Sequence, residues 1–248
     1  MNFFISYLRW RKSREIGVNF FRTKNFNFPD LLLVNEKKRF LYFPNNTTYI
    51  ELFRDVILDD EYKLSLFKNE NIINIVDVGA NLGMFSIAAR ISFKNANIHA
   101  YEPNPNNIAV LGSHGKEFNF KIYEEAVGVR TGRGELTCSS SHDTSARISN
   151  RDEGPIILSD LDTVIHRFKT RKIDLLKLDC EGAEFEILKN SNALKDVRFL
   201  TMEYHLPAKG SEMVLEDLFS TINRLKFKVM YHDRRNVCLG IIVAKNET

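Results

Sequence analysis

From residue 71 onward, short apolar runs rich in β-branched residues alternate with segments of helical periodicity. The first run, Ile72–Gly79, is almost continuously apolar and ends in an acid and a glycine, which is typical of a parallel strand buried on both faces. Four further strands and a closing hairpin are predicted in the same way. They are Asn97–Pro103, Phe120–Gly128, Ile173–Gly182, Phe199–His205, Phe227–His232 and Cys238–Lys245. This pattern predicts an α/β fold with a Rossmann-like, seven-stranded sheet that is mostly parallel and has an antiparallel C-terminal edge.

The segments between the strands carry helices, and an extension precedes them. Helices are predicted at Leu82–Phe93, Asn106–Phe118, Leu161–Phe168, Ala183–Leu188 and Met213–Leu225. The polar stretch Arg130–Pro155 is predicted to contain a hairpin at Gly134–Ser139 and a loop. Residues 1–70 are predicted to form an N-terminal extension, with one helix, short strands around Arg39–Pro44 and a helix within Ile50–Phe67. Residues 71–248 then form the Rossmann-like domain.

Composition limits the class of protein. The 248 residues are 44% hydrophobic, which suits one well-buried α/β domain. The formal net charge is only +3, so nucleic acid is not expected as the main partner. No run approaches the ~20 apolar residues that a membrane-spanning helix needs. The three cysteines, Cys138, Cys180 and Cys238, lie too far apart for a metal motif or a disulfide framework, which favours a reducing, cytoplasmic location.

The first residues, MNFFISYLRWRKSR, place aromatic side chains beside arginines. The basic residues follow the short apolar run and no small-residue cleavage site comes after it, so the segment does not read as a secretory signal. We expect a helix that packs on the domain or on a second subunit of a homodimer. The alternative is peripheral membrane contact through an amphipathic anchor formed by Phe3, Phe4, Leu8, Trp10, Arg9, Arg11, Lys12 and Arg14.

The turn after the first strand, Asp77-Val-Gly79-Ala80-Asn81-Leu-Gly83, predicts the cofactor. Its glycines permit a tight turn and a close approach of a ligand to the backbone. An acid two residues before the first glycine would repel the pyrophosphate of a dinucleotide, whereas it suits the sulfonium and ammonium of S-adenosylmethionine. The glycine spacing also departs from the dinucleotide pattern, and no P-loop lysine follows.

Two more strand ends complete the predicted cofactor site. Glu102 can accept hydrogen bonds from both ribose hydroxyls, and Pro103 and Asn104 turn the chain into the next helix. The small side chain of Ala126 leaves room for adenine. The predicted S-adenosyl-L-methionine site therefore comprises Asp77, Gly79, Ala80, Asn81, Gly83, Glu102, Pro103, Asn104 and Ala126.

Acidic residues cluster where the fourth strand ends. Asp179, Glu181 and Glu184 stand within six residues, and such a cluster is costly unless a cationic or hydroxylic group joins it. An alcohol is a poor nucleophile until it loses its proton, so one acid is predicted to act as base on an acceptor hydroxyl. His205 at the end of the fifth strand is a rival base, because its ordinary pKa lies near neutral pH. These four residues form the predicted catalytic set.

Several polar residues near these strand ends also suit a structural role. The acids after the fourth strand would be favoured at a helix N-terminus. Asp160 and Asp162 are expected to cap the helix at Leu161. Candidates for acceptor contacts in the polar stretch are His142, Asp143 and Ser145. The four catalytic candidates could together hold a hard divalent cation, but no metal is assigned to the site.

Together these segments resemble the FkbM family of methyltransferases over roughly residues 50 to 243. The matching segments are VDVGANLGMFS (Val76–Ser86), YEPNPNN (Tyr101–Asn107), EEAVG (Glu124–Gly128), SDLDTVI (Ser159–Ile165), IDLLKLDCEGAEFEIL (Ile173–Leu188) and MEYH (Met202–His205). The resemblance implies a Rossmann-like fold, S-adenosylmethionine, and O-methylation of hydroxyls on sugars, glycans or polyketide-type products. It carries the cofactor roles onto Asp77, Gly79, Asn81 and Glu102, and the acidic motif onto Asp179, Glu181 and Glu184.

The favoured function is O-methylation of a hydroxyl on a saccharide, glycan or related metabolite, as in polysaccharide biosynthesis. An NAD-dependent oxidoreductase is opposed by Asp77 and by the glycine spacing. A nucleic-acid methyltransferase is opposed at the fourth strand end, which has neither an Asn/Asp-Pro-Pro-aromatic loop nor a Pro-Cys nucleophile. A non-catalytic cofactor-binding module is the remaining alternative.

Overall fold

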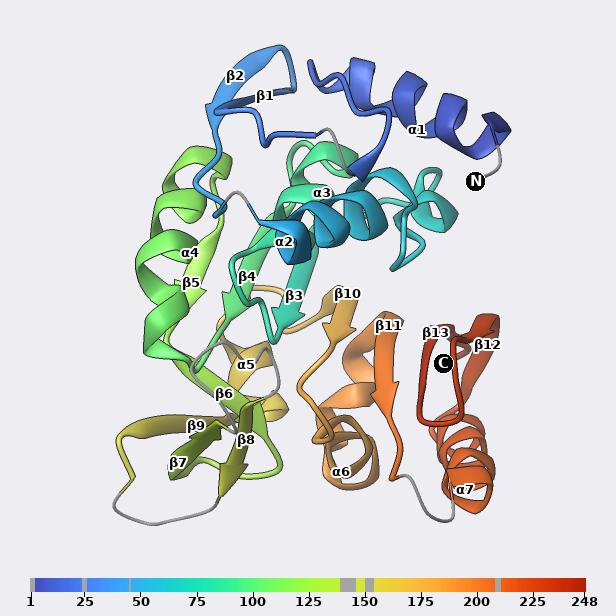
Figure 1. The fold of residues 1–248 in the computed structure, drawn as a ribbon. Coiled ribbons are helices and arrows are strands. Elements are labelled where there is room, and N and C mark those ends of the chain that lie inside the picture. The colour runs from blue at the N-terminus through green and yellow to red at the C-terminus, as the bar shows by residue number, and fades with distance from the viewer. Residues whose placement is uncertain (1–2, 24–25, 45, 139–145, 150–153, 208–210) are drawn as a thin grey trace.

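The computed structural model describes residues 3–23, 26–44, 46–138, 146–149, 154–207 and 211–248. Its core is a seven-stranded sheet in the order β12-β13-β11-β10-β3-β4-β5 (Figure 1). The strands are β3 (Asn74–Val78), β4 (Asn97–Tyr101), β5 (Lys121–Tyr123), β10 (Ile173–Leu178), β11 (Val197–His205), β12 (Phe227–Arg234) and β13 (Leu239–Asn246). The first five are parallel, and β13 and β12 add an antiparallel edge. The predicted Rossmann-like α/β fold is confirmed.

Helices cover both faces of this sheet, which explains the nearly continuous apolar strands. One face packs on α2 (Thr47–Leu52), the π-helical turn η2 (Phe53–Leu58), the 3₁₀ turn η3 (Leu64–Phe67), α3 (Met84–Ser92) and α4 (Pro105–Phe118). The other face packs on α5 (Leu161–His166), α6 (Glu184–Asn190), the 3₁₀ turn η4 (Asn192–Asp196) and α7 (Ser211–Arg224). Successive residues of β3 point to opposite faces, so Ile75 joins the first cluster and Val76 the second.

A second, smaller sheet has the order β6-β9-β7-β8. Its strands are β6 (Glu125–Gly128), β7 (Gly132–Cys138), β8 (Ala146–Ser149) and β9 (Ile156–Asp160). The single strand predicted at Phe120–Gly128 was therefore wrong, because the chain leaves the main sheet after Tyr123. Glu125 holds β6 against β9, since it accepts hydrogen bonds from Ser159 and Arg167. Strand β9 was missed because its apolar run is only three residues long.

Two predictions in the N-terminal extension were right only in part. The strands lie at β1 (Leu31–Val34) and β2 (Lys37–Phe40), so only Arg39 and Phe40 of the predicted Arg39–Pro44 belong to a strand, and Asn35 and Glu36, both with positive φ, form the hairpin turn. The helix predicted within Ile50–Phe67 ends at Leu58, and residues with positive φ follow it at Asp60 and Lys63.

The capping and cysteine predictions have direct counterparts in the structure. Asp160 is the N-cap of α5, where it accepts a hydrogen bond from the Thr163 N–H at 2.7 Å, so its capping role is confirmed. Asp162 lies in the first turn of that helix instead of before it.

Cys180 and Cys238 are free thiols. Among the described helices, none has the length and apolar character to span a bilayer. The candidates His142, Asp143 and Ser145 lie outside the described residues.

Candidate active site

A cavity of about 740 Å³ opens at the carboxyl ends of β3, β4, β10 and β11, where sheets of this type bind ligands. Six predicted cofactor residues line it: Gly79, Asn81, Glu102, Pro103, Asn104 and Ala126. Three predicted catalytic residues also line it: Asp179, Glu181 and His205. The other predicted site residues lie behind this lining: Asp77, Ala80, Gly83 and Glu184.

The glycine turn has a shape that other residues could not adopt. Gly79 has φ of +73°, and a Cβ added to it would lie 1.8 Å from the carbonyl oxygen of Asp179. Gly83 has φ of +92° at the N-cap of α3, where an added Cβ would lie 3.0 Å from Leu111. Asn81 lines the cavity, and its buried Oδ1 atom has no hydrogen-bond partner among the described residues. This oxygen is an acceptor available to a ligand.

Glu102 stands directly after β4 and is almost completely buried. Its carboxylate accepts the Asn81 N–H at 2.7 Å and the Asn104 N–H at 2.9 Å, one on each oxygen. Burial raises the pKa of Glu102, while these hydrogen bonds act in the opposite direction. Oε1 also accepts a hydrogen bond from Asn107 Nδ2 at 3.3 Å, whereas Oε2 has a single donor and can accept a further hydrogen bond from a hydroxyl.

The structure places Asp77 differently from the expectation that its carboxylate faces the cofactor. The side chain is fully buried, accepts a hydrogen bond from Ser86 Oγ at 2.7 Å, and lies 3.1 Å from Lys177 Nζ. Lys177 also donates to the carbonyl oxygens of Val78 at 3.1 Å and Gly79 at 2.7 Å. The charge of Asp77 is therefore compensated behind the turn, and the pair supports the turn from below.

No role for Lys177 was predicted from the sequence, although the sequence contained an indication of one. It interrupts the apolar strand β10, and the parallel register places it beside Asp77 on β3. Burial by itself would lower the pKa of Lys177, but Asp77 and Asp179 outweigh burial and raise it above the ordinary value. The lysine is thus a permanent cation inside the sheet.

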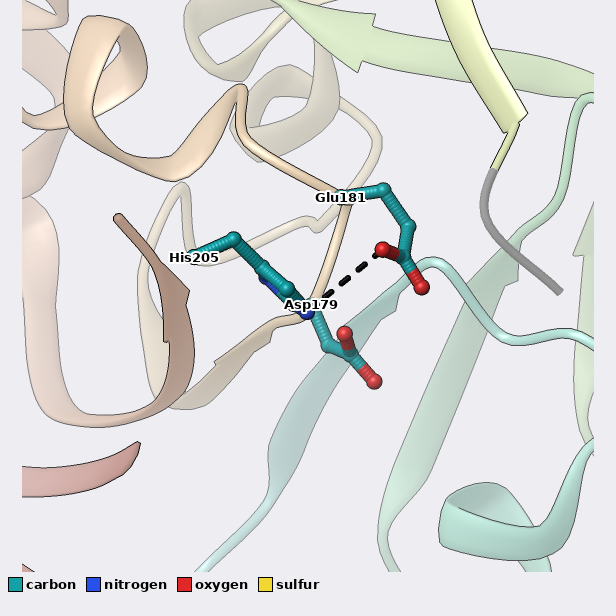
Figure 2. Close-up of side chains that lie close together, drawn as sticks. All are labelled: Asp179, Glu181 and His205. Carbon is teal, nitrogen blue, oxygen red and sulfur yellow. Dashed lines mark ion pairs between the residues drawn. The ribbon is translucent and has the colours of Figure 1, made fainter. Parts of the chain in front are cut away.

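Three predicted catalytic residues meet at the other side of the cavity. One ligand atom from each of Asp179, Glu181 and His205 lies within 4.8 Å of the others, and the side chains point into one space (Figure 2). His205 Nε2 lies 3.5 Å from Glu181 Oε2. Tyr62 donates its hydroxyl hydrogen to Asp179 Oδ2 at 2.8 Å. These separations are short enough for a shared divalent cation, and equally for a protonated imidazole between carboxylates.

Glu184 supports this group from below. It is buried and accepts the N–H groups of Cys180 at 2.6 Å and Gly182 at 2.9 Å, which fixes the loop between β10 and α6. Its Oε1 atom also lies 3.4 Å from His205 Nδ1. Because both oxygens serve the loop, Glu184 orients its neighbours and does not itself line the cavity.

The pKa values of His205 and Glu203 determine which groups of this region are protonated near neutral pH. Burial would lower the pKa of His205, but the carboxylates of Glu184, Glu181 and Asp179 outweigh burial and raise it to about 9. Burial, together with the negative charges of Asp179 and Glu61, raises the pKa of Glu203 to about 8. At neutral pH the ligand-free site therefore holds protons that ordinary histidine and glutamate side chains would release.

Comparison with known proteins agrees with this geometry. Residues 77–229, more than half of the chain, match the family model described as the methyltransferase FkbM domain. The chain belongs to the FkbM methyltransferase family. It is 27% identical over 169 residues to the hexuronic acid methyltransferase AglP of Haloferax volcanii, which covers 65% of this chain and 70% of that protein. A solved fibrillarin/Nop5p complex shares the fold, with a TM-score of 0.51, 13% identity, and coverage of 88% of this chain and 97% of that chain.

Residues outside the matched FkbM segment complete the cavity. Before it come Thr48, Tyr49, Glu51, Leu52, Asp55, Glu61 and Tyr62. After it comes Arg235, whose Nη1 donates to Glu203 at 2.9 Å and which also pairs with Glu61. No motif marked these residues, because the long-range pairing that brings them to the cavity leaves no pattern in neighbouring positions. Membership of a methyltransferase family also sets aside the oxidoreductase alternative.

Proposed function

We propose that this FkbM methyltransferase uses S-adenosylmethionine to O-methylate a hydroxyl of a saccharide, glycan or related metabolite. One observation carries the proposal: a single cavity joins the glycine turn and Glu102 to the group of Asp179, Glu181 and His205. The similarity to a hexuronic acid methyltransferase supports a sugar acceptor.

The residues on the cofactor side fit S-adenosylmethionine. Glu102 would accept a hydrogen bond from a ribose hydroxyl, and the orphaned Oδ1 atom of Asn81 would accept a hydrogen from the ammonium group. Ala126 leaves space for the adenine. Nine acidic side chains line the cavity, against two arginines and the protonated His205. Even with Glu203 protonated, the cavity keeps an excess of negative charge that favours a cationic ligand, although Asp77 is paired elsewhere. The cofactor supplies the methyl group.

His205 is the base that the geometry favours. Glu184 lies at Nδ1 and orients the ring, which leaves Nε2 on the side of Asp179 and Glu181. The cofactor would supply the methyl group to the acceptor oxygen and leave as S-adenosylhomocysteine, and His205 Nε2 would accept the proton that the hydroxyl loses. The imidazole must be neutral to accept it, and a bound sulfonium would oppose the carboxylates that raise the pKa of His205.

Release of S-adenosylhomocysteine from S-adenosylmethionine, measured with the full chain and a panel of neutral hexosides and hexuronides, tests the function. His205→Asn should lower kcat by about 100-fold or more, while its affinity for S-adenosylhomocysteine in calorimetry stays within about threefold. The matched control is His166→Asn, because His166 is an exposed histidine outside the cavity, and it should leave kcat unchanged.

Two results would contradict these assignments. Thermal stabilisation by NAD but not by S-adenosylhomocysteine would refute the cofactor. If EDTA abolished turnover and Mg²⁺ restored it, Asp179, Glu181 and His205 would bind a metal ion and would not act in proton transfer. We expect turnover to persist in EDTA.

A further inference from the structure

Exposed apolar side chains gather in residues 3–42. Fifteen large hydrophobic residues are exposed among the described residues, and nine of them lie in this segment. The six aromatic members of the fifteen all belong to it: Phe3, Phe4, Tyr7, Phe21, Phe40 and Tyr42. Scattered exposed apolar side chains are normal in soluble proteins, but a concentration of aromatics in one segment marks an interaction surface.

Helix α1 (Phe3–Glu15) is the centre of this surface, and its burial pattern is inverted. Its buried residues are two serines, Ser6 and Ser13, whereas Phe3 is 75% exposed and Phe4 is 63% exposed. A helix that only covers a domain buries its apolar face and exposes its polar one. In α1 the exposed apolar side chains instead gather in the first half of the helix, at Phe3, Phe4, Ile5, Tyr7 and Leu8, which indicates that this end serves an outside partner.

Polar contacts fix the rotation of α1 about its axis, so the exposure of its aromatic side chains is a consequence of the fold. The Phe20 N–H donates to Ser13 Oγ at 3.0 Å, and Trp10 Nε1 donates to Asn19 Oδ1 at 2.9 Å. Arg9 Nε donates to Asp59 Oδ1 at 2.7 Å, directly after η2. Turning the helix to bury its aromatics would break these contacts.

The same segment is strongly basic. Residues 1–42 hold nine Lys and Arg against three Asp and Glu, a net charge of +6, so the remainder of this +3 chain carries −3. Arg11 follows Leu8 by three residues and Arg14 follows Tyr7 by seven, which places both arginines on the aromatic stripe of α1. The hairpin β1–β2 adds exposed Lys37 and Lys38.

The hairpin and α1 form one continuous surface. The Leu33 N–H donates to the carbonyl oxygen of Ile16, just after α1, at 2.9 Å. Both elements lie at the end of the molecule from which β3 and β4 point away (Figure 1). The cavity at the carboxyl ends of these strands is therefore remote from the basic aromatic surface.

We propose that residues 3–23 and 26–42 form a face that docks on an anionic lipid bilayer. Exposed aromatic and aliphatic side chains enter the interface between headgroups and acyl chains, and arginines and lysines pair with the lipid phosphates. A symmetric contact with a second copy would instead bring two strongly basic surfaces together. Docking in this way leaves the cavity open to the aqueous phase, and the inference does not depend on the methyl-transfer proposal.

Co-sedimentation of the full chain with vesicles tests the face. Binding to mixed phosphatidylcholine–phosphatidylglycerol vesicles should exceed binding to phosphatidylcholine alone and should weaken as salt is added. Arg11→Gln/Arg14→Gln should lower the partition coefficient about 30-fold, since each cation near the surface contributes about 1 kcal/mol. Phe3→Ser/Leu8→Ser should lower it by about tenfold or more.

Matched controls separate this effect from general surface changes. Lys226→Gln/Lys228→Gln and Met230→Ser/Val237→Ser remove exposed charges and exposed apolar groups outside residues 3–42, and neither should change vesicle binding. All variants should keep their affinity for S-adenosylhomocysteine. Wild-type protein that stays in the supernatant with both vesicles would overturn the proposal. If the wild-type protein does not bind vesicles, two further results would also overturn the proposal. One is a dimer, and the other is retention of RNA, that Phe3→Ser/Leu8→Ser abolishes.

Discussion

Replacing Lys177 by methionine would show how the glycine turn is supported. The ammonium group is buried, lies 3.1 Å from Asp77 Oδ1 and 3.5 Å from Asp179 Oδ2, and donates to two carbonyl groups of the turn. Methionine has a similar length and no charge. The substitution therefore leaves Asp77 fully buried without its cation and removes both hydrogen bonds that hold the backbone at Val78 and Gly79.

The expected cost can be worked from these contacts. Removing one partner of a buried ion pair costs about 3–5 kcal/mol, because the remaining charge has lost both water and its partner. In a chain of this size each kcal/mol lowers Tm by about 2–4 °C, so Lys177→Met should lower Tm by about 10 °C. Adding Asp77→Asn removes the stranded charge, and the double variant should recover more than half of the lost stability.

Thermal unfolding followed by circular dichroism, with Lys228→Met as an exposed-lysine control, measures the effect. The affinity for S-adenosylhomocysteine in calorimetry should fall with Lys177→Met, since the turn loses two hydrogen bonds. A single variant destabilised by less than about 1 kcal/mol would refute the reasoning, because such a loss is typical of an ordinary surface change. A double variant no more stable than the single one would refute it as well.

Three other contacts can be tested by substitution or by pH. Gly79→Ala should destabilise the protein by about 3 kcal/mol or more in urea unfolding, because the added Cβ would clash with the carbonyl oxygen of Asp179. The control is Gly112→Ala in α4, whose added Cβ meets no other atom and should stabilise the protein by about 0.5–1 kcal/mol. Burial lowers the pKa of His114 from 6.5 to about 4, so the unfolded chain binds the proton first. The free energy of unfolding should therefore fall by up to about 3 kcal/mol between about pH 6.5 and pH 4, and His114→Gln should flatten this slope. Arg235→Gln should cost about 1–2 kcal/mol in thermal unfolding because it leaves Glu61 and Glu203 without their cation. Arg234→Gln breaks only exposed contacts, namely the pair with Glu212 and hydrogen bonds to the carbonyls of Asn236 and Val237, and should lower Tm by less.

The sheet and the glycine turn could be predicted because their determinants are local. The apolar run before Asp77 and the glycines after it lie within about twelve neighbouring positions, and the parallel strand order follows from repeated strand–helix alternation. The division of Phe120–Gly128 into β5 and β6 could not be predicted in this way. It depends on Ser159 and Arg167, which approach Glu125 from more than thirty residues away.

The site was predictable in its chemistry and less so in its geometry. Carboxylates at strand ends and His205 could be named as candidates because residue type and strand position can be inferred from the sequence. The partner of each side chain was not, since Tyr62 reaches Asp179 across 117 positions and Lys177 reaches the carbonyl of Gly79 across 98. Those long-range contacts determine which carboxylates face the cavity and which are already hydrogen-bonded or ion-paired inside the protein.

The pairing of Asp77 with Lys177 changes where the electrostatic selection of a ligand must occur. A buried acid whose charge is met by a lysine contributes little field to the cavity, so the turn alone does not favour a sulfonium over a pyrophosphate. Selection of a cationic ligand must therefore come from the acidic side chains that line the cavity, which outnumber its arginines by nine to two. Such a site repels a dinucleotide and is stabilised by a ligand with one positive charge beside hydroxyl groups. The proposed cofactor and a saccharide acceptor would bring both, which is why the unpaired oxygen of Asn81 and the group around His205 lie in the same cavity.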